Sequence, residues 1–384
     1  MGRIQIRFLA VLCKMQDMRN SLVQSLVATA AIVLSMGATT HLAAEGPALF
    51  LDVAEDAKGA PGGADAHGAE AVDTSLEGRL EALAAQHKGH VTLYATQLNT
   101  GKTVAMDADR PVQTASVIKL TILFEAMAQV RSGKAHWDEK LTLAKGEGVS
   151  GSGVLTFFDT PLTLTLKDVL TMMVIVSDNT ATNLAIDRFG VDVVNARIAW
   201  LGLKDTHLYK KVMKPATGPM PADQPKFGLG KTTAREMAMV MERIGRCELA
   251  GPGEASQPGD VEICKVALTM LRNQFYRNTI PRYLEKLDSS EEGSGIGSKT
   301  GSLNAVRNDV AIVAGKSGPM VISIFTYEND DKSWTADNAA EMMIARLAKE
   351  IVEAWSPQGL DGKALVPGLG LSAAAAGTAS GASK

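Results

Sequence analysis

Three short groups of polar residues, far apart along the chain, have residue types suited to nucleophilic catalysis. They are Ser116-Val117-Ile118-Lys119, Ser177-Asp178-Asn179 and Lys299-Thr300-Gly301. Each alone is a weak signal, because a Ser-x-x-Lys arises by chance about once in a chain of this length. Two serines and two lysines could nevertheless form one acyl-transfer site if the fold brings the three groups together.

The first group predicts a nucleophile next to its base. Residues three apart share one face of a helix, so Lys119 can reach the hydroxyl of Ser116. Apolar neighbours and the charge of Lys299 would lower the pKa of Lys119 towards an uncharged amine that accepts a proton. Unpaired N–H groups at the helix N-terminus would suit a developing oxyanion. The alternative, a surface lysine on an amphipathic helix, is disfavoured by those apolar neighbours.

The other two groups each have a plainer structural interpretation. Ser177-Asp178-Asn179 lies between two predicted helices and could simply be the N-cap of the second one. Lys299-Thr300-Gly301-Ser302 precedes a predicted strand and could be a turn. In the functional interpretation, Lys299 offers a positive charge and Gly301 lets a ligand approach the backbone closely.

Strands at both ends of the chain and helices between them are expected to position these groups. Near the N-terminus, capping residues and hydrophobic periodicity predict a helix from Thr74 with Glu77 as capping partner, then strands over 90–98 and 103–108 and a helix over 116–130. A mainly helical stretch follows to about residue 271, with helix starts at Thr165, near Thr180 and at Thr233. The last predicted elements are strands over 309–314 and 320–327 and a helix over about 335–355. This order implies a sheet assembled from distant segments, with a helical insertion.

The two ends of the chain are predicted to lie outside the folded domain. Basic residues, an apolar stretch over 22–36 and the small residues Leu42-Ala43-Ala44 make residues 1–44 a secretory leader, with a membrane anchor as the alternative. We predict a disordered linker over 45–72 and a disordered tail over 359–384. Residues 73–358 then form one compact domain.

Composition and cysteine content narrow the class of protein. The chain has 46% hydrophobic and 21% charged residues, and its net charge of −3 gives no electrostatic reason to expect nucleic acid. Cys247 and Cys264 remain after the leader, and in an oxidising compartment they would pair, with two buried thiols as the alternative. Neither cysteine has a His at ligand spacing, so we predict no metal.

Taken together, the three groups in this order are those of class A β-lactamases and penicillin-binding proteins. The chain resembles these serine hydrolases over about residues 73–358, including Gly151-Ser152-Gly153-Val154-Leu155 and the segment 177–184. The resemblance implies an α+β fold. An antiparallel sheet formed by the N- and C-terminal segments would be flanked by helices, with an inserted all-helical subdomain.

The resemblance also implies a role for each group. Ser116 would attack the carbonyl of a lactam or peptide, Lys119 would act as the base, and Ser177 would relay a proton to the leaving nitrogen. Substrate binding would fall to Asn179, which would hold the side-chain amide, and to Lys299, Thr300, Gly301 and Ser302, with Arg307 as a further ligand for the substrate carboxylate. The backbone N–H groups of Ser116 and Ser302 would form the oxyanion hole.

One departure from the family pattern concerns deacylation. Class A enzymes carry a Glu on the loop after the central helices, preceded by a Trp, but residues 201–231 contain neither. Asp205 and Asp223 are the only acids in this stretch. Without a positioned carboxylate, an acyl-enzyme is expected to hydrolyse slowly.

The sequence therefore predicts an exported serine hydrolase, periplasmic or secreted, that opens β-lactams or related amides through an acyl-Ser116 intermediate. The alternatives are a D-Ala-D-Ala peptidase or esterase, or a binding protein that acylates and turns over poorly. We expect a small-molecule lactam or a cell-wall peptide as substrate, and a monomer without cofactor, nucleic acid or a stable membrane span after processing.

Overall fold

The computed structural model describes residues 75–251, 253–290 and 294–365. These residues belong to one compact unit. The predicted leader over 1–44 and linker over 45–72 lie outside the described residues, as do residues 366–384. Within the described part of the chain, no helix combines the length and the apolar content that crossing a bilayer requires.

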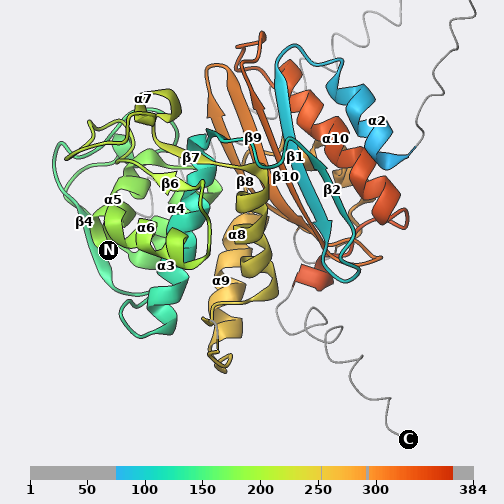
Figure 1. Ribbon diagram of the computed structural model, residues 1–384. Coiled ribbons are helices and arrows are strands. Elements are labelled where there is room, and N and C mark those ends of the chain that lie inside the picture. Colours follow the sequence, from blue (N-terminus) through green and yellow to red (C-terminus); the bar gives the residue numbers. More distant parts are fainter. Residues whose placement is uncertain (1–74, 252, 291–293, 366–384) are drawn as a thin grey trace, which may run out of the picture. The chain divides into compact units, whose positions relative to one another are not determined.

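A five-stranded antiparallel sheet lies at the centre of this unit (Figure 1). Its strands, in the spatial order β2-β1-β10-β9-β8, are Thr103–Met106, His90–Gln97, Met320–Tyr327, Val306–Val313 and Ile296–Leu303. Strands from both ends of the chain thus pair side by side. This confirms the predicted α+β fold with a sheet assembled from N- and C-terminal segments.

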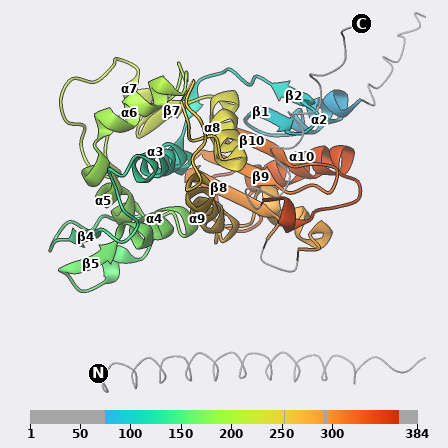
Figure 2. The ribbon, with the colours of Figure 1, turned by 90° about the horizontal axis from the view of Figure 1, so that it is seen from below.

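Helices cover both faces of the sheet (Figures 1 and 2). On one face lie α2 (Leu76–Ala84) and α10 (Ala339–Trp355), and on the other lie α8 (Ala234–Arg246) and α9 (Asp260–Arg272). The side chains of β10 show why this works. Ile322 and Ile324 pack in the core under α10, while Val321 and Phe325 pack in the core that includes α8 and α9. Alternate residues of a strand point to opposite faces, so one apolar strand fills both cores.

The region between the N- and C-terminal strands is mainly helical. Besides α8 and α9, its α-helices are α3 (Lys119–Arg131), α4 (Leu166–Ile175), α5 (Asn179–Phe189), α6 (Val191–Trp200) and the short α7 (Gln224–Phe227). Two small sheets accompany them, β4 (Lys140–Leu143) with β5 (Leu162–Thr165), and β3 (Val112–Gln113) with β7 (Gly230–Thr232) and β6 (His207–Leu208). Five 3₁₀ turns complete the described elements: η1 (Ala115–Ile118), η2 (Leu155–Phe157), η3 (Ile280–Tyr283), η4 (Glu285–Leu287) and η5 (Gly362–Leu365).

Several predicted helix boundaries agree with the structure, and the caps explain why. Thr165 and Asp168 form the predicted capping box of α4, and Thr233 caps α8. By contrast, the prediction of Thr74 as the first cap is wrong, because the Ser75 side chain accepts from Gly78 N. The last helix begins later than predicted, since Asn338 is its N-cap.

Two other predictions near the site need correction. The helix predicted over 116–130 is divided into η1 and α3, so Ser116 lies in a 3₁₀ turn. The Lys-Thr-Gly group does not precede a strand but lies within β8, whose many Gly and polar residues lack the alternation of a typical strand. Strand β9 also begins at Val306 rather than at the predicted Asp309.

The folded unit extends past the predicted end of the domain. Leu360 is fully buried and forms isolated bridges with Asp288 and Gly315. The predicted start of the disordered tail at Gly359 is therefore wrong, because Leu360 packs in the hydrophobic core under α10 and so belongs to the folded unit.

Cys247 and Cys264 form a disulfide that joins the end of α8 to α9. The two cysteines are 17 residues apart in the sequence. Closing a loop of this length restricts the unfolded chain and contributes about 3 kcal/mol to stability. The alternative of two buried thiols is thus not what the structure shows.

We predict that Cys247→Ser lowers the free energy of unfolding by about 3 kcal/mol, because the open loop gains conformational entropy when the chain unfolds. Urea denaturation of the variant and of the wild type, with and without reductant, measures this. Reduced wild type should match the variant. Two free thiols at these positions in unreduced, denatured protein would contradict the assignment.

Candidate active site

A cavity of about 500 Å³ brings the three groups together. It lies where η1, the connection between α4 and α5, and the edge strand β8 meet. Its lining residues are Ser116, Gly151, Ser152, Ser177, Tyr276, Asn278, Thr279, Thr300, Gly301, Ser302, Trp334, Thr335 and Glu341. Both predicted serines and three residues of the predicted Lys-Thr-Gly-Ser group therefore face one space.

The nucleophile candidate Ser116 is fixed by its backbone. The preceding residue, Ala115, has a φ of 44°, a conformation that L-residues rarely adopt. Strand β8 lies so close that a Cβ on Gly301 would stand 2.8 Å from Ser116 N. Glycine is needed there because strand β8 abuts the serine turn, rather than because a ligand approaches it, as the sequence had suggested.

Lys119 lies directly behind the serine and is fully buried. Its Nζ is 2.6 Å from the carbonyl oxygen of Ser177, 3.1 Å from Ser177 Oγ and 3.1 Å from Asn179 Oδ1. Burial lowers the pKa of Lys119 well below its ordinary value of 10.5, and the charge of Lys299 lowers it further. Among the described residues, Lys119 forms no hydrogen bond with the Ser116 hydroxyl that it was predicted to reach. Its Nζ is bound instead by the carbonyl oxygen and the hydroxyl of Ser177.

Ser177 has a strained backbone conformation and directly precedes the N-cap residue of α5. Its φ is 54°, again in the left-handed region. The next residue, Asp178, caps α5 by accepting from Ala181 N, and it also accepts from Val154 N and Leu155 N. The capping interpretation of this group is thus confirmed for Asp178, and the same cap holds Ser177 at the cavity.

Lys299 reaches the same hydroxyl from the opposite side. Its Nζ donates to Ser177 Oγ at 3.0 Å and to the carbonyl oxygen of Thr300 at 2.8 Å. Burial lowers the pKa of Lys299 to about 7, while the carboxyl of Asp309 on β9 opposes this shift. Burial in turn raises the pKa of Asp309 to about 6.

One hydroxyl therefore lies between two buried amines, and this sets what the site can do. A hydroxyl carries one proton and two lone pairs, so Ser177 can accept from Lys299 and donate to Lys119 when Lys119 is uncharged. The chain of groups from Lys299 through Ser177 to Lys119 forms a path along which a proton can move. Such a path suits general acid–base catalysis at neutral pH.

Asn179 lies behind the cavity rather than in its lining. Its Nδ2 donates to the carbonyl oxygen of Ser150, its Oδ1 accepts from Lys119, and its backbone N–H donates to the carbonyl oxygen of Ser152. It therefore orients Lys119 and the segment that carries Gly151 and Ser152. Its predicted contact with a substrate amide stays a prediction.

Strand β8 supplies the other wall. It is an edge strand: β9 pairs with one side, and within the described residues no strand pairs with the other. Alternate backbone groups along a free edge are unpaired and can bind a ligand. This supports the predicted oxyanion hole at Ser116 and Ser302, whose exact donors stay a prediction. Thr300 and Ser302 line the cavity with their hydroxyls.

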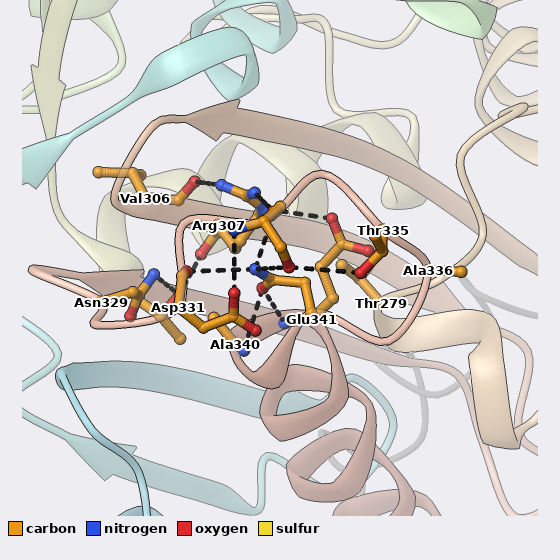
Figure 3. Close-up of polar contacts among 12 residues, drawn as sticks. Thr279, Val306, Arg307, Asn329, Asp331, Thr335, Ala336, Ala340 and Glu341 are labelled. Carbon is orange, nitrogen blue, oxygen red and sulfur yellow. Dashed lines mark hydrogen bonds and ion pairs between the residues drawn. The ribbon is translucent and has the colours of Figure 1, made fainter.

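Of the predicted substrate ligands, Asn179 and Lys299 lie behind the cavity, and Arg307 is also absent from its lining. Arg307 is bound instead to other parts of the fold (Figure 3). Its guanidinium is buried and donates to the carbonyl oxygens of Leu303, Val306 and Ser333 and to the carboxylate of Glu341. Four of the five N–H groups of Arg307 thus have protein partners, which leaves one for a substrate carboxylate. Glu341, its partner, lines the cavity instead.

Among the described residues, the loop over 201–231 contributes no carboxylate to the lining of the cavity. Asn183 fixes Val212 through both backbone groups, at 2.8 and 3.0 Å. The next residue, Met213, is near Gly151, since a Cβ placed on Gly151 would stand 3.6 Å from the Met213 Cε. Asp223 is bound to the Tyr209 hydroxyl and to Lys231, and no residue of the loop is among those that line the cavity.

Sequence reasoning missed half of the cavity. Tyr276, Asn278 and Thr279 come from the connection between α9 and β8, and Trp334 and Thr335 come from the connection between β10 and α10. Glu341 lies in the first turn of α10. None belongs to a motif. The exposed aromatic residues Tyr276 and Trp334 were the one available signal, since large apolar side chains are unusual in polar connections.

Comparison with known proteins agrees with this geometry. The Beta-lactamase enzyme family matches residues 75–355. A crystal structure of a β-lactamase from Sphaerobacter thermophilus is similar at 29% identity and a TM-score of 0.60, covering 73% of this chain and 96% of that one.

Two further relatives are more distant. PBP-A, solved also as a mutant acyl-enzyme complex with penicillin G, is similar in fold at 22% identity and a TM-score of 0.59, covering 73% of this chain and 96% of that one. The β-lactamase regulatory protein BlaB of Streptomyces cacaoi is 22% identical over 298 residues, which is 70% of this chain and 94% of BlaB. The match of a family over most of the chain, together with the convergence of its three residue groups on one cavity, places the chain in the β-lactamase enzyme family.

Proposed function

We propose that the chain is a serine hydrolase that is acylated on Ser116 by β-lactams or related amides and releases the acyl group slowly. The observation that carries this proposal is the convergence of Ser116, Ser177 and the Lys-Thr-Gly strand on one cavity, with both lysines buried behind it. A structural site would have no need for two buried amines, because burying a charge without a partner is costly.

The side chains of Ser116, Lys119 and Ser177 supply the nucleophile, the base and the proton donor that acylation needs. The Ser116 oxygen attacks the carbonyl carbon, and its proton passes to the uncharged amine of Lys119. Backbone N–H groups of Ser116 and Ser302 would stabilise the negative oxygen. As the carbon–nitrogen bond breaks, Ser177 gives its proton to the leaving nitrogen and takes one from Lys119, which returns to its uncharged form.

Slow deacylation is proposed from what surrounds the cavity. Hydrolysis of an acyl-serine needs a base that activates water. Within the described residues the only carboxylate that lines the cavity is Glu341, which is bound to Arg307 at 3.2 Å. Among the described residues, the loop that carries a Glu in class A enzymes contributes no side chain to the cavity lining.

The relatives support each of two outcomes. The structure named as a β-lactamase supports hydrolysis. The name of BlaB, a regulatory protein, supports the second candidate, a protein that binds lactams and stays acylated. We propose in addition that the protein acts in the periplasm or outside the cell, for which the disulfide is the support.

We predict that a fluorescent penicillin labels the purified protein covalently and that Ser116→Ala abolishes the label, because the proposed acyl bond forms on the Ser116 hydroxyl. Ser132→Ala is a matched control, since this exposed serine follows α3. Gel fluorescence measures the label, and its decay separates a hydrolase from a trap. We expect it to persist for minutes. A wild-type protein that takes no label, or a Ser116→Ala variant that labels equally, would refute the proposal.

We predict a descending limb in the pH profile of acylation for substrates that carry a carboxylate. Lys299, with a pKa of about 7, is charged below this pH and uncharged above it. Its attraction for the substrate carboxylate is therefore lost as pH rises, so the second-order rate constant should fall above about pH 7. An uncharged ester should show no such fall.

Asp309→Asn sharpens this measurement. The carboxyl of Asp309 opposes the lowering of the Lys299 pKa. Removing its charge should move the descending limb to lower pH for carboxylate substrates and leave the ester profile unchanged. Parallel profiles for the two kinds of substrate in the wild type would contradict the assigned role of Lys299.

A further inference from the structure

The cavity has an unexpected distribution of charge. Among the described residues that line it there is one carboxylate, that of Glu341, and no lysine or arginine. Lys119 and Lys299 are fully buried behind the serines. Two aromatic side chains, Tyr276 and Trp334, line the same cavity and are 40% and 68% exposed.

The carboxylate is presented to the cavity, and its cationic partner is not. The side chain of Glu341 is 16% exposed, whereas that of Arg307 is only 1% exposed. Burial raises the pKa of Glu341, and the nearby charges of Arg307 and Arg282 oppose this rise. Arg307 therefore anchors the carboxylate from behind, and its remaining N–H bonds go to backbone carbonyl groups (Figure 3).

The segment that carries Trp334 is held in a fixed conformation. Asp331 accepts from Ser333 N and from Ala339 N, and these bonds lower the pKa of Asp331 to about 2. Asn338 donates to the carbonyl oxygens of Asp331 and Ser333. The guanidinium carbon of Arg307 lies 4.5 Å from the centre of the Trp334 ring, so the indole rests on the buried arginine. The aromatic wall is thus formed before a ligand arrives.

A cavity lining that combines a carboxylate with exposed aromatic rings has the chemistry with which proteins bind ammonium groups. The ring face attracts a cation, and a carboxylate accepts its N–H bonds. We propose that Glu341, Tyr276 and Trp334 form a subsite for a positively charged amine, so that the substrates are lactams or peptides that carry an ammonium group. This inference rests on the proposed function for its reaction and concerns which substrate that reaction takes.

Binding to a protein that cannot be acylated tests the subsite independently of the reaction. In the Ser116→Ala background, ligand titrations compare benzylpenicillin with ampicillin, which adds one ammonium group to the acyl side chain. A second pair is a cephalosporin with and a cephalosporin without a quaternary ammonium group on the opposite side of the lactam. The same titrations use Glu341→Gln and, as a matched control on α10, Glu353→Gln, whose carboxylate pairs with Lys349 away from the cavity.

We expect the cationic member of at least one pair to bind about tenfold more tightly, and this preference to disappear in Glu341→Gln but not in Glu353→Gln. Equal binding within both pairs, or a preference that survives Glu341→Gln, would overturn the proposal. In the acylatable protein, a Glu341→Gln variant that deacylates more slowly with its ligand preference intact would also overturn it, because Glu341 would then be a base. Failure of wild-type acylation with the preference intact would instead count only against the proposed reaction.

Discussion

The site depends on one hydroxyl shared by two buried amines. Ser177 Oγ is 3.1 Å from the Nζ of Lys119 and 3.0 Å from the Nζ of Lys299. Two ammonium ions so close together in a dry environment would repel each other, and each would lack its hydration. The structure relieves this by disfavouring the charged form of Lys119. In the proposed mechanism, Lys119 can then act as the base and Ser116 as the nucleophile.

The rest of the fold holds these groups in place at some local cost. Two residues of the site, Ala115 and Ser177, have positive φ values that L-residues avoid. Such strain persists only where the surroundings determine the backbone. Asp178 ties the Ser177 turn to two segments, Gly301 allows β8 to abut the serine turn, and Asn308 donates to the carbonyl oxygens of Gln113 and Thr114. The catalytic geometry is therefore a product of the sheet and the helical region together.

The sequence predicts those elements that are determined by residues close together in the chain. Caps such as Thr165 and Thr233, and the apolar alternation of β10, act within a few residues, and these elements were found. Strand β8 was missed because its pairing with β9 overrides a weak local propensity. The resemblance assigned Arg307 to the substrate because it lies within one residue of the position where the family often places a carboxylate-binding arginine. The distance along the chain does not reveal that Glu341, from the last helix, already binds it.

The same reasoning explains the unpredicted half of the cavity. Tyr276, Trp334 and Glu341 line one cavity although they come from three different segments, and no short motif records such an arrangement. By contrast, the lack of a Glu in residues 201–231 could be read directly, since a residue type that is missing from a segment is missing in every alignment. Among the described residues that line the cavity, the one carboxylate is that of Glu341, and Arg307 binds it.

Burial and the charge of Lys299 hold the pKa of Lys119 well below its ordinary value of 10.5, and NMR titration of lysine side-chain nitrogens tests this most directly. Lys119→Arg would identify the resonance. The Nζ of Lys119 should titrate well below 10.5. An ammonium signal for Lys119 that persists up to that ordinary value would contradict it.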